Sequence, residues 1–147
     1  MATEPASTEA RQTMRVKVLS PARAAFDGEA LEAGLPAFDG EWGILPNHAP
    51  LVAALATGCL RLKMPDGRGL AFAIRGGYAQ VRDNVVTVLA PECLGPDELT
   101  AELVEAEAGK VKDGAGVAGQ GSEPARQLAW ARACRLALEQ APQRPKT

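Results

Sequence analysis

Hydrophobic and polar residues alternate along short stretches in the first two thirds of the chain. Residues 14–18 read Met, Arg, Val, Lys, Val, and residues 59–64 alternate in the same way with Arg61 and Lys63 outward. A period of two predicts β-strands with one buried face, because successive side chains of a strand point to opposite sides. Further strands are predicted at residues 51–55, which are apolar enough to lie inside, and at residues 70–74 and 84–89.

Turn signals separate these segments. Asp-Gly pairs stand at 27–28, 39–40 and 66–67, and Gly76-Gly77 and Asp83-Asn84 add two more. These residue types reach positive φ at low cost, which favours tight turns. The tetrapeptide Phe-Asp-Gly-Glu occurs at 26–29 and at 38–41, and we interpret it as one turn sequence used twice. Many short strands between frequent turns predict a mainly β domain, a sandwich or barrel, over residues 14–94.

Residues 95–147 are rich in helix-forming Ala, Glu, Leu, Lys and Arg, and predict a C-terminal α-helical hairpin. Pro96, Asp97 and Glu98 suit a first helical turn, and this helix is expected to end near residues 113–114. Residues 113–123 form a Gly-rich linker that cannot hold a helix. Ser122 is expected to cap a second helix, with Pro124 in its first turn, that runs to about Glu139. The apolar stripes expected on the two helices are Leu99, Leu103, Ala106 and Val111, then Leu128, Ala131, Cys134 and Leu138.

Charge and composition narrow the classes of partner. The chain has 16 basic and 18 acidic residues, a net charge of -2, so no field of one sign favours nucleic acid or an anionic membrane surface. No apolar run approaches the roughly 20 residues that span a bilayer, so membrane association is expected only through a partner. Residues 1–13 are polar and mixed in charge, and we expect a flexible N-terminal arm there. The partners are therefore predicted to be proteins.

The candidate chemical groups do not form a catalytic or cofactor site. Cys59, Cys93 and Cys134 stand too far apart for a zinc knuckle or redox motif, and we expect them to be small apolar residues. His48 is the only histidine, without a metal-ligand cluster or a nearby nucleophile. Residues 114–119 match GxGxxG formally but follow a helix, so the flexible-linker interpretation is favoured. The residues predict no catalytic residue, no cofactor and no metal.

Several exposed candidates keep two interpretations each. Asp39 and Glu41 lie on a glycine-rich turn and are expected to be solvated. Trp42, beside them, either plugs the end of the core or meets a partner. The arginines at 126, 132 and 135 form a basic helix face, which is either solvated or docks on an acidic partner surface. The residues themselves therefore indicate a non-catalytic interaction module.

A longer motif adds a family resemblance. Residues 40–51 read GEWGILPNHAPL, which resembles the G-E-x-G-I-L-P-x-H-A-P-L stretch of the ATP synthase ε subunit family. Residues 18–21 with 26–29 resemble that family's opening strand and turn, and residues 76–81 with 84–90 resemble its closing strands. The matches cover about residues 14–92 in the correct order, which makes the resemblance more specific than a single motif.

The resemblance implies a ten-stranded β-sandwich followed by the hairpin. It also implies a non-catalytic subunit in the central stalk of a proton-translocating ATP synthase, peripheral on the cytoplasmic face of the bacterial inner membrane. The implied partners are the γ subunit, the c-ring and, through an extended tail, the α and β subunits. Glu41 and His48 match c-ring contact positions, Trp42 is a variable position in the same ring-facing loop, and Ser20 matches a position close to γ.

The tail departs from the family pattern. Some relatives bind ATP through an L-D-x-x-R-A-type motif early in the first tail helix, but Thr100 stands in place of the acid and Leu103 in place of the arginine. We therefore expect no ATP sensing. The second helix looks short and follows a long Gly-rich linker, so the resemblance leaves open whether this tail can extend and block rotation. A free-standing β-sandwich adaptor or small-molecule binding domain, and an enzyme, are the alternatives from other classes.

Overall fold

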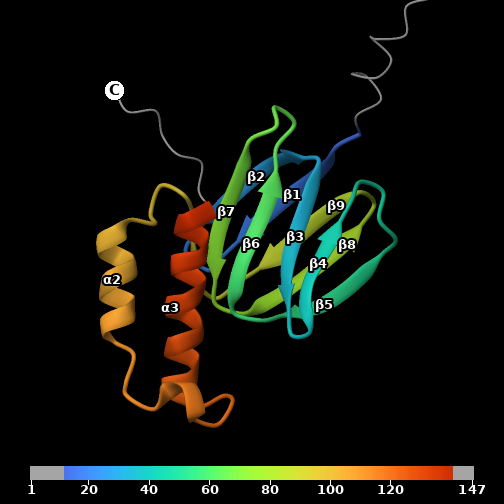
Figure 1. Cartoon of the computed structure of the whole chain (residues 1–147). Coiled ribbons are helices and arrows are strands. Elements are labelled where there is room, and N and C mark those ends of the chain that lie inside the picture. The colour runs from blue at the N-terminus through green and yellow to red at the C-terminus, as the bar shows by residue number, and fades with distance from the viewer. Residues whose placement is uncertain (1–11, 141–147) are drawn as a thin grey trace, which may run out of the picture.

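The structure, a computed structural model, describes residues 12–140 and contains ten strands in two sheets followed by helices (Figure 1). This confirms the ten-stranded sandwich and the helical tail. The strands are β1 (Met14–Leu19), β2 (Ala24–Ala30), β3 (Glu32–Ala37), β4 (Gly40–Ile44), β5 (Leu51–Leu55), β6 (Gly58–Lys63), β7 (Gly69–Ile74), β8 (Gly77–Arg82), β9 (Val85–Leu89) and β10 (Cys93–Leu94).

Each sheet has five strands. The first, sheet A, has the order β2-β1-β9-β8-β5, and the second, sheet B, has the order β10-β7-β6-β3-β4. Strands β1 and β9 pair in parallel, and the other strand pairs of the described residues are antiparallel. The edge strand β4 in sheet B is linked to the edge strand β5 in sheet A by residues 45–50. One side of the sandwich is therefore formed by β4, this loop and β5.

The main core lies between the sheets and follows the predicted alternation. Met14, Val16 and Val18 of β1 are buried, while Arg15 between them is exposed. Leu60 and Leu62 point into the same core from β6, and Arg61 and Lys63 are exposed as expected. Strand β5 corrects one expectation, because only part of it lies inside: Val52 is 75% exposed. A strand at the edge of a sheet keeps one face in solvent even when its sequence is apolar throughout.

The predicted turns are confirmed except for one Asp-Gly pair. Gly40, Gly67, Gly76 and Gly77 have positive φ, and Asp83 and Asn84 form a two-residue turn with φ of 51° and 63°. Asp27 and Gly28, however, lie inside strand β2, where they pair with Lys17 and Val16. The ring of Phe26 explains this glycine, because a Cβ on Gly28 would stand 3.1 Å from Phe26 Cζ. The repeated tetrapeptide therefore has two different structures.

The helical tail has different bounds from those predicted. Helix α2 spans Ala101–Gly109 and is capped by Thr100, whose hydroxyl accepts from the Leu103 N–H at 3.1 Å. Residues 96–98 form a turn before the helix instead of its first turn. Within the linker a short 3-10 turn, η1, spans Ala115–Val117, and helix α3 spans Glu123–Gln140. Ser122 does cap α3, accepting from the Ala125 N–H at 3.3 Å.

Helix α3, with 18 residues, has nearly the bounds predicted for the second helix, whereas α2, with 9 residues, is shorter than the predicted first helix. The buried face of α2 also differs from the predicted stripe, because Val104 and Glu107 are buried and Ala106 is exposed. None of the helices in residues 12–140 has the length and apolar character needed to cross a membrane.

Helix α3 covers the outer face of sheet B over β6 and β7, and α2 packs on α3 (Figure 1). Small side chains on this face, Cys59, Ala71 and Ala73, leave room for the helix, while Phe72 and Ile74 point into the main core. A second hydrophobic cluster thus forms between sheet and helices. We define the hairpin cluster by its buried members Cys59, Ala71, Ala73, Leu99, Val104, Trp130, Ala133, Cys134 and Ala137.

The separation of the two clusters supports one prediction about domain organisation. A chain truncated after Leu94 is expected to keep the cooperative unfolding of the sandwich, because the main core contains no residue beyond Cys93. Truncation exposes the alanine face of β7, and this exposed apolar face is expected to lower the solubility of the truncated chain. Urea unfolding of the truncated and full chains, followed by circular dichroism, measures this. A gradual transition in the truncated chain would show that the hairpin is part of the same folding unit.

Candidate functional site

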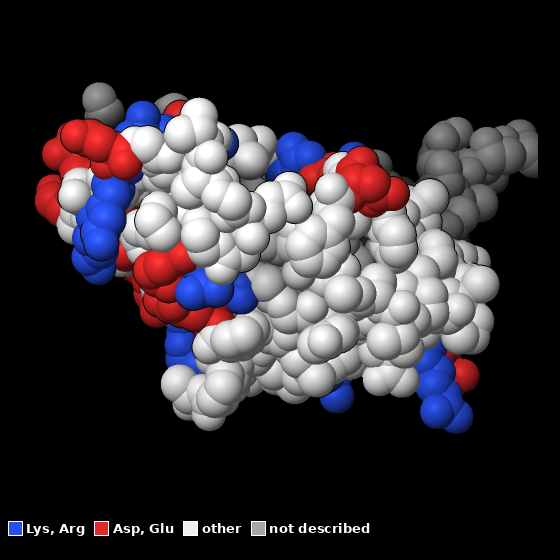
Figure 2. Space-filling model, turned by 90° about the horizontal axis from the view of Figure 1, so that it is seen from below, with Lys and Arg blue, Asp and Glu red and all other residues white. Residues whose placement is uncertain are grey.

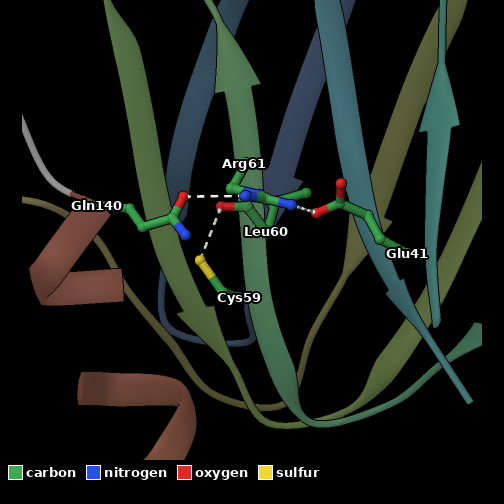
Figure 3. A network of polar contacts seen from close by, with 5 residues as sticks. All are labelled: Glu41, Cys59, Leu60, Arg61 and Gln140. Carbon is green, nitrogen blue, oxygen red and sulfur yellow. Dashed lines mark hydrogen bonds and ion pairs between the residues drawn. The ribbon is translucent and has the colours of Figure 1, made fainter. Parts of the chain in front are cut away.

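Glu41 lies on the outer face of sheet B and is held there by Arg61 (Figure 3). Strand β3 separates β4 from β6, so the two side chains meet across it. Arg61 Nε donates to Glu41 Oε2 at 2.8 Å, and Nη2 donates to the same oxygen. The carboxylate raises the pKa of the Arg61 guanidinium through this hydrogen bond. Glu41 is therefore not a freely solvated turn residue, which corrects that expectation.

A glycine on the intervening strand makes this contact possible. A Cβ on Gly34 would stand 2.8 Å from Glu41 Cδ and 2.9 Å from Oε2. The carboxylate therefore lies directly on the β3 backbone. Arg61 Nη1 also donates to Gln140 Oε1 at 3.1 Å, which brings the last residue of α3 to the same site. Sequence reasoning missed Gly34 and Arg61, which contact Glu41, and Gln140, which contacts Arg61, because other elements of the fold carry them.

Trp42 follows Glu41 on the edge strand but belongs to the other face. Its register partner Leu35 is fully buried, so Trp42 lies on the side of β4 that faces the core. Its side chain remains 39% exposed at the edge. Phe38, in the turn before β4, is 78% exposed. The two aromatic residues give this turn and edge an accessible apolar surface.

His48 lies in the loop between β4 and β5, at the opposite end of β4 from Glu41. Asn47 has a φ of 64°, and its N–H donates to Asn84 Oδ1 at 2.7 Å, which ties the loop to the β8–β9 turn. His48 Nδ1 lies 2.7 Å from its neighbour's carbonyl oxygen, Ala49 O. From residue 41 to residue 44 a strand rises by about 10 Å. The structure therefore does not bring Glu41 and His48 together, although both lie along the same side of the sandwich.

Ser20 lies beside an open apolar groove at the end of the sandwich that carries the β3–β4 turn. Its N–H donates to Arg23 O at 2.9 Å, which closes the β1–β2 loop. The groove has a volume of about 640 Å³ and is lined by Leu19, Ser20, Pro21, Gly77, Tyr78, Leu89, Ala90 and Pro91. Tyr78 and Leu89 are register partners and are 61% and 53% exposed. Seen from below, the sandwich shows a broad uncharged face, and charged side chains gather over the helical end (Figure 2).

Trp130 anchors the hairpin and was not singled out by the sequence. It is fully buried, and the guanidinium carbon of Arg75 lies 4.4 Å from the centre of its ring. Arg75 Nε is 2.8 Å from Glu92 Oε2, an ion pair without the alignment of a hydrogen bond. Residues 130, 133, 134 and 137 have the i, i+3, i+4, i+7 spacing of a buried helix face. This spacing is the sequence pattern from which the burial of Trp130 could have been predicted.

Of the three arginines on α3, Arg126 pairs with Glu123, and Arg132 and Arg135 are exposed.

The three cysteines are free and buried, as expected of small apolar residues. Burial raises the pKa of each thiol to about 11, because the thiolate would lose its hydration.

Thiolate absorbance is therefore expected to develop near pH 11 in the native chain and near pH 9, the ordinary value, in denaturant. Since the unfolded chain releases these protons first, stability is expected to be lost as the pH rises from 9 to 11. Replacing the cysteines with alanine serves as the control; a native titration near pH 9 would contradict the burial.

The described residues contain no group of three or more His, Cys, Asp or Glu side chains that could hold a metal ion. The formal GxGxxG sequence contains η1 and has no strand before it, so the dinucleotide geometry is absent from the part of the chain that is described. The accessible features are instead surfaces: the β4 side of the sandwich, the groove beside Ser20, and the outer face of α3.

The chain was compared with protein families, with known proteins and with solved structures. Residues 13–95 match the family model described as "ATP synthase, Delta/Epsilon chain, beta-sandwich domain". The ATP synthase epsilon chain of Synechococcus elongatus is 44% identical over 94 residues, which cover 64% of this chain and 68% of that relative. An epsilon chain of another Synechococcus strain is 36% identical over 124 residues, covering 84% and 89%. A chain of the Euglena gracilis mitochondrial ATP synthase structure has a similar fold, with a TM-score of 0.60 and 21% identity over 86% of this chain and 78% of that chain.

Proposed function

Since this chain belongs to the ATP synthase delta/epsilon family, we propose that it is a non-catalytic subunit of the central stalk, which couples rotation of the c-ring to the γ subunit. The observation that carries this proposal is the family match over residues 13–95, which coincides with the ordered sandwich. The proposed place is the cytoplasmic face of a bacterial inner membrane, with membrane attachment only through the partners.

The apolar groove beside Ser20 is the proposed contact for γ. It is uncharged, lies at one end of sheet A, and includes the half-exposed Tyr78 and Leu89. Burial of apolar surface stabilises an association by about 25 cal/mol per Å² before the costs of binding are subtracted. An uncharged partner surface that fits between the two prolines would suit this groove better than a charged one.

The β4 side of the sandwich is the proposed contact for the c-ring. Glu41 and Trp42 supply a carboxylate and an aromatic edge near the β3–β4 turn, and His48 supplies a second contact in the β4–β5 loop. Because the strand separates Glu41 from His48, a partner that touches all three residues must lie along this side rather than at one end. Single replacements of Glu41 and His48 can therefore distinguish an extended contact from a local one.

The stiffness of the sandwich suits transmission of torque. Its interior is close-packed and resists strain, and the β4–β5 loop is fixed to the β8–β9 turn by the Asn47–Asn84 contact. The hairpin is docked on sheet B, with Thr100 as a helix cap where ATP-binding relatives carry an acid. We propose that the tail does not sense ATP and that contact with the α and β subunits would require the hairpin to leave sheet B.

A double replacement, Glu41→Ala with His48→Ala, tests the ring contact. We expect weaker attachment to the membrane ATP synthase and a free energy of unfolding that changes by less than about 1 kcal/mol, because exposed ion pairs contribute little to stability. Co-purification with the membrane complex measures attachment, and urea unfolding measures stability.

The matched control is Arg15→Ala, which breaks an ion pair of similar exposure with Asp27 on sheet A. A variant that stays attached but melts at a much lower temperature would contradict the ring contact. A chain that runs separately from γ on gel filtration would contradict the stalk function and favour a free-standing adaptor.

A further inference from the structure

One side chain, Arg61, joins the C-terminal end of α3 to the Glu41 carboxylate (Figure 3). Its Nη1 donates to Gln140, while Nε and Nη2 donate to Glu41 Oε2. A guanidinium carries its donors in one rigid plane. Movement of the guanidinium toward one partner therefore changes its geometry at the other.

The docking of the hairpin fixes the position of Gln140. Helix α3 is anchored to sheet B by the fully buried Trp130, with Arg75 packed on its ring. Gln140 is the last residue of this helix and lies at its exposed end. When the helix leaves the sheet, Gln140 must leave Arg61.

Gly34 and Arg61 together fix the position of Glu41. The Glu41 side chain lies on the β3 backbone, where a Cβ on Gly34 would collide with it. Arg61 donates two hydrogen bonds to Glu41 Oε2. Among the described residues no hydrogen bond is made to Oε1. That oxygen remains available to a donor on another molecule.

We propose that Arg61 is a positioning residue that couples the docked state of the hairpin to the orientation of Glu41. With α3 docked, Gln140 holds the guanidinium so that Glu41 presents Oε1 to a hydrogen-bond donor of the ring. A partner bound to Glu41 in turn favours the docked hairpin, since such coupling is reciprocal. The identity of the partner rests on the proposed function, but the coupling between Glu41 and α3 is a property of this chain alone.

The buried cysteines provide a measurement of docking in the full chain. Cys59 and Cys134 belong to the hairpin cluster, and Cys93 belongs to the main core. Release of the hairpin exposes the first two to a thiol reagent, whereas only unfolding of the sandwich exposes Cys93. Labelling rates of each cysteine at pH 8, followed by mass spectrometry, therefore separate release from unfolding.

The variants Glu41→Gln, Arg61→Met and Gln140→Ala are each expected to raise the labelling rate of Cys134 about two- to five-fold, the range for exposed ion pairs and hydrogen bonds. Cys93 is expected to stay at the wild-type rate. In the Arg61→Met background, Glu41→Gln should add nothing, because the path between Glu41 and α3 is gone. The matched control, Arg15→Met, breaks the Asp27 pair on sheet A and should leave all three rates unchanged.

An unchanged Cys134 rate in Glu41→Gln, or the full effect of Glu41→Gln in the Arg61→Met background, would overturn the proposal. Neither result depends on a partner. If the Cys134 rates contradict the coupling but the chain attaches normally to the ATP synthase, only the coupling fails. If the rates show the coupling but the chain does not attach, only the stalk function fails.

Discussion

Replacing Trp130 with alanine is expected to release the hairpin from sheet B while the sandwich stays folded. Trp130 is the largest fully buried side chain, and its removal leaves a cavity between α3 and the sheet. Truncation of a buried tryptophan costs about 3–5 kcal/mol. The contact with Arg75 adds about 0.5–2 kcal/mol, because a cation over an aromatic ring is attracted to its face.

Labelling of Cys59 and Cys134 with Cys93 still protected would report this release, and urea unfolding would show whether the sandwich transition persists. The matched control is Trp42→Ala, which removes the chain's other tryptophan from a position that is 39% exposed. We expect that variant to leave Cys59 and Cys134 protected, because Trp42 lies on β4 and is not part of the hairpin cluster. If Trp130→Ala abolished the sandwich transition, the hairpin and the sandwich would be one cooperative unit.

Replacing Gly77 with alanine is expected to destabilise the sandwich itself. Gly77 has a φ of 123°, and a Cβ there would lie 2.1 Å from the carbonyl oxygen of Leu89 and 3.0 Å from Ala90 Cα. Both obstacles are backbone atoms beside the β8–β9 pairing, which cannot move without breaking the ladder. Backbone strain of about 1–3 kcal/mol and overpacking of about 1–3 kcal/mol together predict a loss of about 2–6 kcal/mol in the free energy of unfolding.

Gly40 separates these two contributions. Its φ is 131°, but no heavy atom lies within 4 Å of the place where a Cβ would stand. Gly40→Ala is therefore expected to cost only the backbone strain. Urea unfolding of both variants measures the difference, and equal losses would mean that the collision with Leu89 and Ala90 is relieved without cost. The groove beside Ser20 includes Gly77, so Gly77→Ala is also expected to weaken the proposed contact with γ.

Strand positions were predictable where one face is buried, as in β1, because alternation is a local property. The same reasoning failed for Asp27-Gly28, which has the sequence of a turn but lies in β2 under the ring of Phe26. It also failed at the start of α2, where Thr100 accepts the hydrogen bond of a helix cap and residues 96–98 form a separate turn. Residue preferences at these positions are weak, and neighbouring contacts decide between two allowed conformations.

The sequence proposes members of the candidate site but not their arrangement. Residues 40–51 name Glu41, Trp42 and His48 as candidates through the family motif. Their separation along β4 depends on the strand between them, and the Glu41–Arg61 contact depends on Gly34 of a third strand. The buried face of α3 shows the same limit: the spacing from Leu128 predicted a stripe that omitted Trp130, although the spacing from Trp130 itself fits a buried face.

The sequence by itself determined the β-sandwich, the helical tail and the family motif. These depend on side-chain periodicity, turn residues and the order of motifs along the chain, all of which are present before folding. Only the tertiary structure decided that α3 covers the alanine face of sheet B and that Arg61 joins Glu41 to Gln140. The partners of Arg61 stand 20 and 79 positions away in the chain, and such contacts arise only when strand register and helix docking bring them together.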